Sequence, residues 1–288
     1  MTDGPVAILA GSGRLPLQLV QHLERSGRDH RILAFRGFVE PEIRRRAHAT
    51  VALLDLRRIM ATLERWQPSV VTLVGAVSRP GFAALLGAYS LFANRSEVRD
   101  VIARGDDQML RGAVGLLEER GYRVVGAHEL APELVVARGL AGQVAASPQD
   151  RLTVELGLAL LEALSAFDIG QAAVLAGRRV LAIEGPEGTD RMLRRVRRLR
   201  GARFARPARK EGGVLVKAAK RGQDLRVDMP TIGPRTVIEA AKAGLSGIAI
   251  GAGSSLLLDQ ADALRTADEL GLFLASVDLP WMDGHEGR

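Results

Sequence analysis

The N-terminal segment alternates an apolar run, a glycine turn and an amphipathic stretch, and this pattern restricts the folds open to the chain. Residues 6–10 are apolar, Gly11-Ser12-Gly13 follows, residues 15–25 space apolar side chains as a helix does, and a second apolar run occupies 31–35. Strand, glycine turn, helix and strand form a βαβ unit. Because Val-rich runs alternate with helical stretches up to about residue 125, the sequence predicts a parallel sheet covered by helices on both faces.

The length of 288 residues predicts two domains, since single domains usually have about 100–200 residues. We expect an α/β fold with two α/β domains: a Rossmann-like nucleotide-binding domain over residues 1–130, a linker over 131–150 where Pro and Gly interrupt the helical pattern, and a C-terminal α/β catalytic domain over 151–288. In the second domain the pattern predicts a hairpin within 172–183 and a strand at Leu225–Val227. A substrate crevice is expected between the domains.

The composition excludes several kinds of site. The chain has no cysteine, which rules out disulfides, Cys-ligated zinc, iron–sulfur clusters and thiol nucleophiles. No apolar run reaches the roughly 18 residues that span a bilayer, and the N-terminus lacks the basic flank of a secretory signal. We therefore expect a cytoplasmic protein.

The net charge of +7 is concentrated in one stretch. Between Arg191 and Lys210 the chain has ten cations and no acid. Such a run attracts phosphates, nucleic acid or anionic lipid headgroups, and the alternative is an Arg-rich helix with a solvated face.

Loops at predicted strand ends are candidates for a phosphate or nucleotide site. The glycine turn at 11–13 follows a strand and opens a helix, where backbone N–H groups can receive a phosphate; a tight turn that needs glycine is the alternative. Ser78 and Arg79 follow the strand predicted at residues 69–74 and are placed to meet a diphosphate or a sugar. Asp107 begins a helix, where an aspartate is either an N-cap or available to a sugar hydroxyl or a metal.

Acidic residues gather in the second half of the chain. Glu184, Glu187 and Asp190 lie in a glycine-rich loop that enters a helix, and Asp228 follows a predicted strand just before a proline, which cannot continue a ladder. With Lys217 at the end of another predicted strand, these carboxylates are the ingredients of a Mg²⁺ site that acts on phosphate. Each acid taken alone is more often a helix cap or a surface charge.

Seven short segments occur in an order that resembles the LpxI family of UDP-2,3-diacylglucosamine pyrophosphatases, and they span nearly the whole chain. They are Leu9-Ala10-Gly11-Ser12-Gly13-Arg14-Leu15-Pro16, the Gly75–Pro80 loop, Arg104-Gly105-Asp106-Asp107, Gly126-Ala127-His128-Glu129, Asp168-Ile169-Gly170-Gln171, Glu187-Gly188-Thr189-Asp190 and Val227-Asp228-Met229-Pro230-Thr231-Ile232-Gly233. The resemblance implies two α/β domains that hydrolyse the diphosphate of a lipid-linked substrate to UMP and 2,3-diacylglucosamine 1-phosphate. It also implies a role in lipid A biosynthesis in Gram-negative bacteria and a divalent cation, usually Mg²⁺.

The resemblance also implies roles for single residues. Asp228 becomes the leading catalytic and metal-binding candidate, supported by Asp190 in both roles and by Glu187 as a metal ligand. Asp224 is expected to matter much less, because it lies three residues before the end of the same predicted strand segment. The residues expected to bind substrate are Gly11, Ser12, Gly13, Ser78, Arg79, Asp107, Gln171, Gly188, Thr189, Lys217 and Thr231. Where the family carries Asn-Val-Ser-Arg-Pro in the middle loop, this chain has Ala76, so any contact made by that asparagine is missing.

Two other functions stay open at this point. The βαβ opening and Arg36 suit an NADP-dependent or nucleotide-sugar oxidoreductase, which would bind its cofactor at the glycine turn and need no metal. The arginine run suits an RNA- or membrane-binding protein with salt-dependent binding. For the hydrolase we expect the lipid-linked substrate and an anionic inner-membrane surface as partners, peripheral association with the inner membrane and no nucleic acid, and we leave a homodimer open.

Overall fold

The structure is a computed structural model that describes residues 4–53, 55–77, 106–167, 169–201 and 212–282, with only the backbone at 106–109. The chain forms two compact units: unit 1 consists of Met1–Pro132 together with Asp224–Asp228, and unit 2 consists of Glu133–Gln223 and Met229–Arg288. The prediction of two α/β domains is confirmed. A short piece of the second half of the sequence therefore belongs to unit 1, and residues 133–150, expected as a linker, belong to unit 2.

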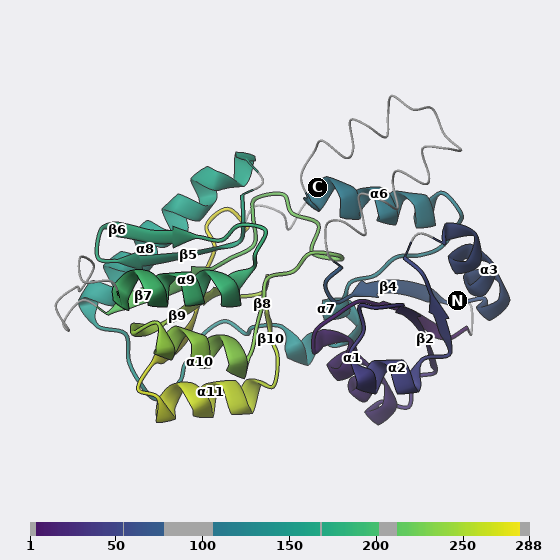
Figure 1. Cartoon of the computed structure of the whole chain (residues 1–288), viewed down its shortest axis with the longest axis horizontal. Helices are drawn as coiled ribbons and strands as arrows, with labels where there is room; N and C mark the ends of the chain where they lie inside the picture. Colours follow the sequence, from purple (N-terminus) through teal and green to yellow (C-terminus); the bar gives the residue numbers. More distant parts are fainter. Residues whose placement is uncertain (1–3, 54, 78–105, 168, 202–211, 283–288) are drawn as a thin grey trace. The chain divides into compact units, whose positions relative to one another are not determined.

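Unit 1 is built on a four-stranded parallel sheet in the order β3-β2-β1-β4 (Figure 1). Its strands are β1 (Val6–Ala10), β2 (His30–Phe35), β3 (Ala49–Val51) and β4 (Val70–Val74). The central strand β1 is wholly buried, and its Ile8 pairs with Ile32 on one side and with Thr72 on the other. A strand buried on both faces needs apolar side chains throughout, which is why residues 6–10 show no alternation.

Helices cover both faces of this sheet. They are α1 (Leu15–Arg25), α2 (Pro41–Arg46), α3 (Leu56–Trp66), α6 (Asp106–Glu118) and α7 (Ala127–Leu130). On one face, Leu9 of β1 packs in a common core with Leu63 of α3 and Leu117 of α6. Successive strand residues point to opposite faces, so Ile8 is buried on the other face, which α1 and α2 cover (Figure 1).

Residues 123–125 lie parallel to β4 on its outer side. The Val71 N–H donates to the Arg123 carbonyl at 2.8 Å, and the Val125 N–H donates to the Val71 carbonyl at 2.9 Å. This segment forms a single bridge, between Val71 and Val124. It places the following residue, Gly126, at the same edge of the sheet as the loops that leave β1 and β4.

Unit 2 has a five-stranded mixed sheet in the order β11-β9-β7-β5-β6 and a two-stranded parallel sheet, β10-β8. The strands are β5 (Ala172–Ala176), β6 (Arg179–Ile183), β7 (Gly213–Lys217), β8 (Thr231–Ile232), β9 (Leu245–Gly251), β10 (Leu256–Leu257) and β11 (Phe273–Val277). β7, β9 and β11 are parallel, whereas β5 is antiparallel to β6 and β7. The predicted hairpin is confirmed as β5–β6, which turns at Gly177, where φ is +54°.

The helices of unit 2 also lie on both faces of its sheet. They are α8 (Pro148–Leu164), α9 (Thr189–Gly201), α10 (Pro234–Lys242) and α11 (Gln260–Glu269), with 3-10 turns η1 (Pro132–Leu134) and η2 (Ser165–Phe167). One core joins Leu193 of α9 and Val237 of α10 to one face, and a second core joins Leu161 of α8 to the other. None of the helices in the described ranges combines the length and apolar character needed to cross a membrane.

The prediction of a strand at Leu225–Val227 is wrong, because these residues form a turn. The Arg226 N–H donates to the Asp224 side chain at 3.0 Å, and the N–H groups of Val227 and Asp228 donate to the Asp224 carbonyl at 3.3 and 3.2 Å. An aspartate that bonds the backbone two residues ahead stabilises a turn in place of a ladder. Asp228 therefore follows a turn, not a strand.

Candidate active site

Two glycine loops meet at the carboxyl edge of the unit 1 sheet. The chain continues from β1 to β2 on one side while β4 pairs on the other, so the edge between β1 and β4 is a switch point, where open α/β sheets bind ligands. There the Gly11 N–H donates to the Val74 carbonyl at 2.8 Å, and Ser12 and Ala76 exchange two backbone hydrogen bonds of 2.8 and 3.0 Å. The Ser12 hydroxyl also donates to the Ala76 carbonyl at 2.7 Å. The structure thus joins the predicted glycine turn to the loop after β4.

Both loops need glycine for a physical reason. A Cβ on Gly75, whose φ is +88°, would lie 2.6 Å from the Ser12 carbonyl oxygen, and a Cβ on Gly11 would lie 2.7 Å from the Ala76 carbonyl oxygen. Gly13 has a φ of +95° and open space where a Cβ would be, and α1 begins two residues later without a side-chain hydrogen bond at its N-cap. An unobstructed backbone before a helix N-terminus can receive a phosphate.

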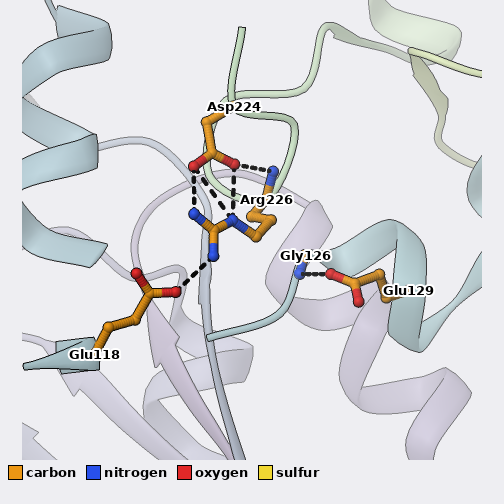
Figure 2. Close-up of polar contacts among 5 residues, drawn as sticks. All are labelled: Glu118, Gly126, Glu129, Asp224 and Arg226. Carbon is orange, nitrogen blue, oxygen red and sulfur yellow. Dashed lines mark hydrogen bonds and ion pairs between the residues drawn. The ribbon is translucent and has the colours of Figure 1, made fainter. Parts of the chain in front are cut away.

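Arg226 attaches the segment 224–228 to unit 1 (Figure 2). Its guanidinium donates from Nε and Nη2 to the Asp224 carboxylate at 2.9 and 2.7 Å, and from Nη1 to Glu118 at the end of α6 at 2.7 Å. We call Glu118, Asp224 and Arg226 the Arg226 cluster. The neighbouring Val227 packs on the apolar core of unit 1. Ionic and apolar contacts therefore both hold the segment.

The charges of the Arg226 cluster reinforce one another. Hydrogen bonds from the Arg226 side chain hold the pKa of Asp224 below its ordinary value, although burial acts in the opposite direction. The hydrogen bond with Asp224 in turn raises the pKa of Arg226. Both groups are therefore charged at neutral pH.

The segment 224–228 lies at the same edge of the sheet as the glycine loops. A Cβ on Gly126 would lie 3.0 Å from the Arg226 Cα, so the backbone of the segment 224–228 packs directly on this glycine. The Gly126 N–H donates to Glu129 Oε1 at 2.8 Å (Figure 2), which closes the first turn of α7. Because Gly126 follows residues 123–125 at the carboxyl edge, the segment that carries Asp228 packs at this edge too.

His128 lies in α7 close to the same segment. Burial lowers the pKa of His128, against the charges of Glu129 and Asp224, which raise it. Its Nδ1 atom is buried and has no hydrogen-bond partner in the part of the chain that the structure describes. We expect a neutral imidazole here at pH 7.

A second polar cluster lies in unit 2, at the carboxyl end of β7. The Lys217 Nζ donates to the Thr189 hydroxyl at 2.7 Å and lies 3.5 Å from Glu184 Oε1. Glu184 accepts hydrogen bonds from the Thr189 hydroxyl at 2.5 Å and from the Gln171 N–H at 2.9 Å. We call Gln171, Glu184, Thr189 and Lys217 the Lys217 cluster. It brings together three residues predicted to bind substrate, and Gly188, with a φ of +81°, directly precedes Thr189.

Burial sets the electrostatics of the Lys217 cluster, since the side chains of Lys217 and Glu184 are only 6% and 9% exposed. Burial alone would raise the pKa of Glu184, but the charge of Lys217 and hydrogen bonds from Thr189 and Gln171 outweigh it and hold this pKa below its ordinary value. The sequence places Glu184 among the carboxylates of a Mg²⁺ site, whereas in the structure Glu184 is paired with Lys217. One signal in the sequence points to this pair: Glu184 directly follows β6, Lys217 ends β7, and their charges are opposite.

The other predicted acids of unit 2 have arginine partners. Asp190 pairs with Arg235 at 2.9 Å, and Glu187 pairs with Arg195 at 2.8 Å. Over the described ranges, no group of three or more His, Asp or Glu side chains is arranged to hold a metal ion. Asp228 belongs to unit 1, whereas Glu187 and Asp190 belong to unit 2, so neither unit alone contains all three predicted ligands. The metal site stays a prediction.

The remaining predicted residues contribute less to the geometry. The Thr231 hydroxyl, in β8, donates to the Met229 carbonyl at 2.9 Å. Ser78 and Arg79 lie outside the described residues, as does the side chain of Asp107 in the first turn of α6. Their roles stay predictions.

Comparison with known proteins decides the family. Residues 5–134 match the family model of the LpxI N-terminal domain, and residues 137–275 match that of the LpxI C-terminal domain. The UDP-2,3-diacylglucosamine pyrophosphatase LpxI of Caulobacter vibrioides is 38% identical over 273 residues, which are 95% of this chain and 97% of that protein. The chain belongs to the LpxI family. It is therefore an enzyme of the hydrolase class, and the oxidoreductase and nucleic-acid-binding alternatives are not favoured.

Two solved structures share a weak likeness with this LpxI family member. A glycinamide-RNase-transformylase T from Mycobacterium tuberculosis is 19% identical, with a TM-score of 0.21 over 62% of this chain and 42% of that one. An N5-carboxyaminoimidazole synthase from Aspergillus clavatus is 13% identical, with a TM-score of 0.24 over 64% of this chain and 41% of that one. The chain matches less than half the length of either protein, and likeness at these scores carries no argument about function.

Proposed function

We propose that this LpxI family member hydrolyses UDP-2,3-diacylglucosamine to UMP and 2,3-diacylglucosamine 1-phosphate in lipid A biosynthesis. The observation that carries the proposal is the 38% identity, over 95% of the chain, to a protein named for action on that substrate. In this reaction water adds across the diphosphate: one P–O bond breaks, one forms to the water oxygen, and each product leaves with a phosphate group.

Asp228 is the proposed catalytic carboxylate, with Asp190 as the second candidate. The segment that carries Asp228 packs at the carboxyl edge of unit 1, where the loop of Gly13 leaves backbone open to a phosphate. A carboxylate at such an edge can orient the attacking water or hold a cation against the diphosphate. Both roles stabilise charge that develops in the transition state.

The proposed substrate contacts differ in what they can offer. The loop of Gly11, Ser12 and Gly13 is proposed to bind a phosphate at the open backbone of Gly13, because the N–H groups of Gly11 and Ser12 already donate to the Val74 and Ala76 carbonyls. Ser78, Arg79 and Asp107 are the further proposed contacts on unit 1. On unit 2 the proposed contacts are Gln171, Gly188, Thr189, Lys217 and Thr231. The charge of Lys217 is already compensated by Glu184, which makes it the weakest phosphate ligand of this set.

We propose a divalent cation as cofactor, with Mg²⁺ as the leading candidate, because the carboxylates present fit it. Mg²⁺ typically takes one or two protein carboxylates and completes its shell with water and substrate phosphates, so it does not need a cage of protein ligands. We propose Asp228 as the first ligand and Glu187 and Asp190 as the others. When bound, the cation would offset the charge of the diphosphate.

We also propose that unit 1 is Rossmann-like. Its strand order, β3-β2-β1-β4, is the first part of the 3-2-1-4-5-6 order of dinucleotide-binding folds, and residues 123–125 occupy the next position beside β4. The crevice between the domains stays a prediction.

Peripheral association with an anionic inner-membrane surface is proposed through α9. Its exposed Arg191, Arg197 and Arg198 have no ion-pair partner among the described residues, and each such cation near an anionic surface can be worth about 1 kcal/mol. We expect the protein to co-sediment with phosphatidylglycerol vesicles, and to lose this binding at about 0.5 M salt, where the screening length falls to about 4 Å. The homodimer stays a prediction.

The test of the proposed function is release of UMP from UDP-2,3-diacylglucosamine in mixed micelles, with Mg²⁺ or with excess EDTA. We expect EDTA to abolish turnover and leave the far-UV circular dichroism unchanged, because the cation is not a structural element. Asp228→Ala should lower kcat on the order of 10² to 10³. The matched control is Asp29→Ala in the same unit, an exposed aspartate before the amino end of β2. Turnover by Asp228→Ala within a few-fold of the parent would exclude Asp228, and no UMP from the parent enzyme would exclude the reaction.

A further inference from the structure

The Arg226 cluster joins the end of α6 to the segment that carries the proposed catalytic residue. Glu118 ends α6 and Arg226 is 108 residues later, yet their side chains meet at 2.7 Å. Arg226 contacts Asp224 through three N–H···O distances of 2.9, 3.2 and 2.7 Å (Figure 2). A guanidinium bound on two sides by carboxylates has a fixed orientation, because its N–H groups form a rigid fork.

The same cluster continues through the backbone to Asp228. The Asp224 carboxylate accepts the Arg226 N–H at 3.0 Å, and the Asp224 carbonyl accepts the Asp228 N–H at 3.2 Å. Asp224 therefore connects the guanidinium to the backbone of Asp228. The sequence predicts a minor role for Asp224, whereas the structure places it at the centre of this connection.

We propose that Arg226 is a positioning residue for hydrolysis: held between Asp224 and Glu118, it sets the place of the Asp228 carboxylate at the carboxyl edge of unit 1. The inference rests on the proposed function, in which Asp228 is catalytic. Arg226 is not proposed as a phosphate ligand, because a substrate phosphate would have to displace one of its two carboxylate partners.

The partial exposure of the cluster separates this role from a purely structural one. The side chains of Arg226 and Glu118 are 34% and 45% exposed, and ion pairs this open to water contribute little to stability. In contrast, a displacement of about 1 Å at a reacting group can lower a rate by about 10²-fold. Loss of the cluster should therefore lower kcat much more than it lowers stability.

The test measures kcat and KM for UMP release, and the urea midpoint, in Arg226→Gln and Glu118→Gln. We expect Arg226→Gln to lower kcat by about 10- to 100-fold, with KM within about threefold of the parent and little change in the urea midpoint. Glu118→Gln removes one arm only and should show a smaller loss of kcat. Arg226→Lys keeps the charge without the fork and should stay impaired.

The matched control is Arg265→Gln. Arg265 lies on α11 and, like Arg226, bridges two acids, Asp262 at 3.0 Å and Glu269 at 2.9 Å. It belongs to no proposed site, so its replacement should leave kcat and KM unchanged. If Arg226→Gln does not fold, Glu118→Gln carries the test.

A double variant shows whether Arg226 acts through Asp228. In the Asp228→Ala background, Arg226→Gln should lower the residual kcat no further, because the residue that it positions is gone. The same fold loss in both backgrounds would overturn the proposal, as would a raised KM with unchanged kcat, or a parent-like kcat in Arg226→Gln. A parent-like Asp228→Ala would instead overturn the proposed catalytic role, so the two failures are distinguishable.

Discussion

The carboxyl edge of unit 1 and the carboxyl end of β7 in unit 2 are both polar, but they are built from different groups. The first is made largely of backbone, in two glycine loops that bond to each other through Ser12 and Ala76. The second is made of side chains, with Lys217 and Glu184 buried and paired with each other. A backbone edge with open space at Gly13 can accept a ligand, whereas a buried and satisfied ion pair chiefly holds strand ends together.

The two ion clusters of the units differ in the same way. The Arg226 cluster is partly exposed, so water screens its charges and replaces lost contacts. The Lys217 cluster is buried, so removal of one partner leaves an uncompensated charge. This contrast predicts that substitutions in the Lys217 cluster lower stability strongly. Substitutions in the Arg226 cluster should lower stability little and the rate of hydrolysis strongly.

The largest effect on stability is expected from Lys217→Met. It leaves the Glu184 carboxylate buried without its cation, which should lower the free energy of unfolding by about 3–5 kcal/mol. The measurement is urea unfolding followed by circular dichroism. The double variant Lys217→Met/Glu184→Leu should recover most of the loss, because neither charge remains. A loss below about 1 kcal/mol in the single variant would show that the pair is not buried as described.

The next largest effect is expected from Gly75→Ala. The new Cβ would lie 2.6 Å from the Ser12 carbonyl oxygen at a φ of +88°, so strain and overlap together should lower the free energy of unfolding by about 2–4 kcal/mol. The matched control is Gly37→Ala, also in unit 1, with a φ of +85° but no atom near the new Cβ. The control should lose only the strain, about 1–2 kcal/mol. Equal losses in the two variants would contradict the close approach of the glycine loops.

A smaller effect is expected from acid. The folded protein holds the pKa of Glu184 below its ordinary value of 4.5, so this group contributes stability that is fully present above pH 4.5 and is lost as the pH falls through the lowered value. Urea unfolding between pH 6 and pH 3 measures it. The double variant Lys217→Met/Glu184→Leu lacks this contribution and should lose less stability than the parent over the same range. If the free energy of unfolding fell equally with pH in the parent and the double variant, Glu184 would not titrate with a lowered pKa.

The smallest effect on stability is expected from Arg226→Gln, which should change the free energy of unfolding by less than about 1 kcal/mol. The reason is that its pair with Glu118 is open to water, that Asp224 keeps its bond from the Arg226 N–H, and that Val227 still packs on the core of unit 1. Urea unfolding of the variant beside the parent measures this. A loss as large as that of Lys217→Met would remove the contrast between the two clusters.

Much of the fold follows from local pattern. Residues 6–10 form β1 because a run of apolar residues fits a strand buried on both faces, and the β5–β6 hairpin forms where two apolar runs flank Gly177. The segments that resemble the LpxI family lead to the right family for the same reason: they are short, local and readable one by one. The glycine turn at 11–13 is also placed at the end of a strand as predicted.

Two expectations failed, and their causes differ. Leu225–Val227 has the composition of a strand, but Asp224 bonds its amides and Val227 packs on unit 1, so a turn forms. Glu184 is expected among the carboxylates of a Mg²⁺ site, but the structure pairs it with Lys217, 33 residues away. In the first case a local turn and a packing contact distant in the sequence act together, and in the second an ion pair between distant residues decides.

The sequence by itself determined the alternation of strands and helices, the division into two α/β units, the absence of thiol chemistry and membership of the LpxI family. These depend on residue type and spacing, which are local. Only the tertiary structure decided that residues 224–228 return to unit 1, that Glu118 and Arg226 meet, and that Lys217 and Glu184 are buried together. The reason is that burial and ion pairing depend on which distant strand ends and loops the fold brings within a few ångströms, and no spacing along the chain encodes that distance.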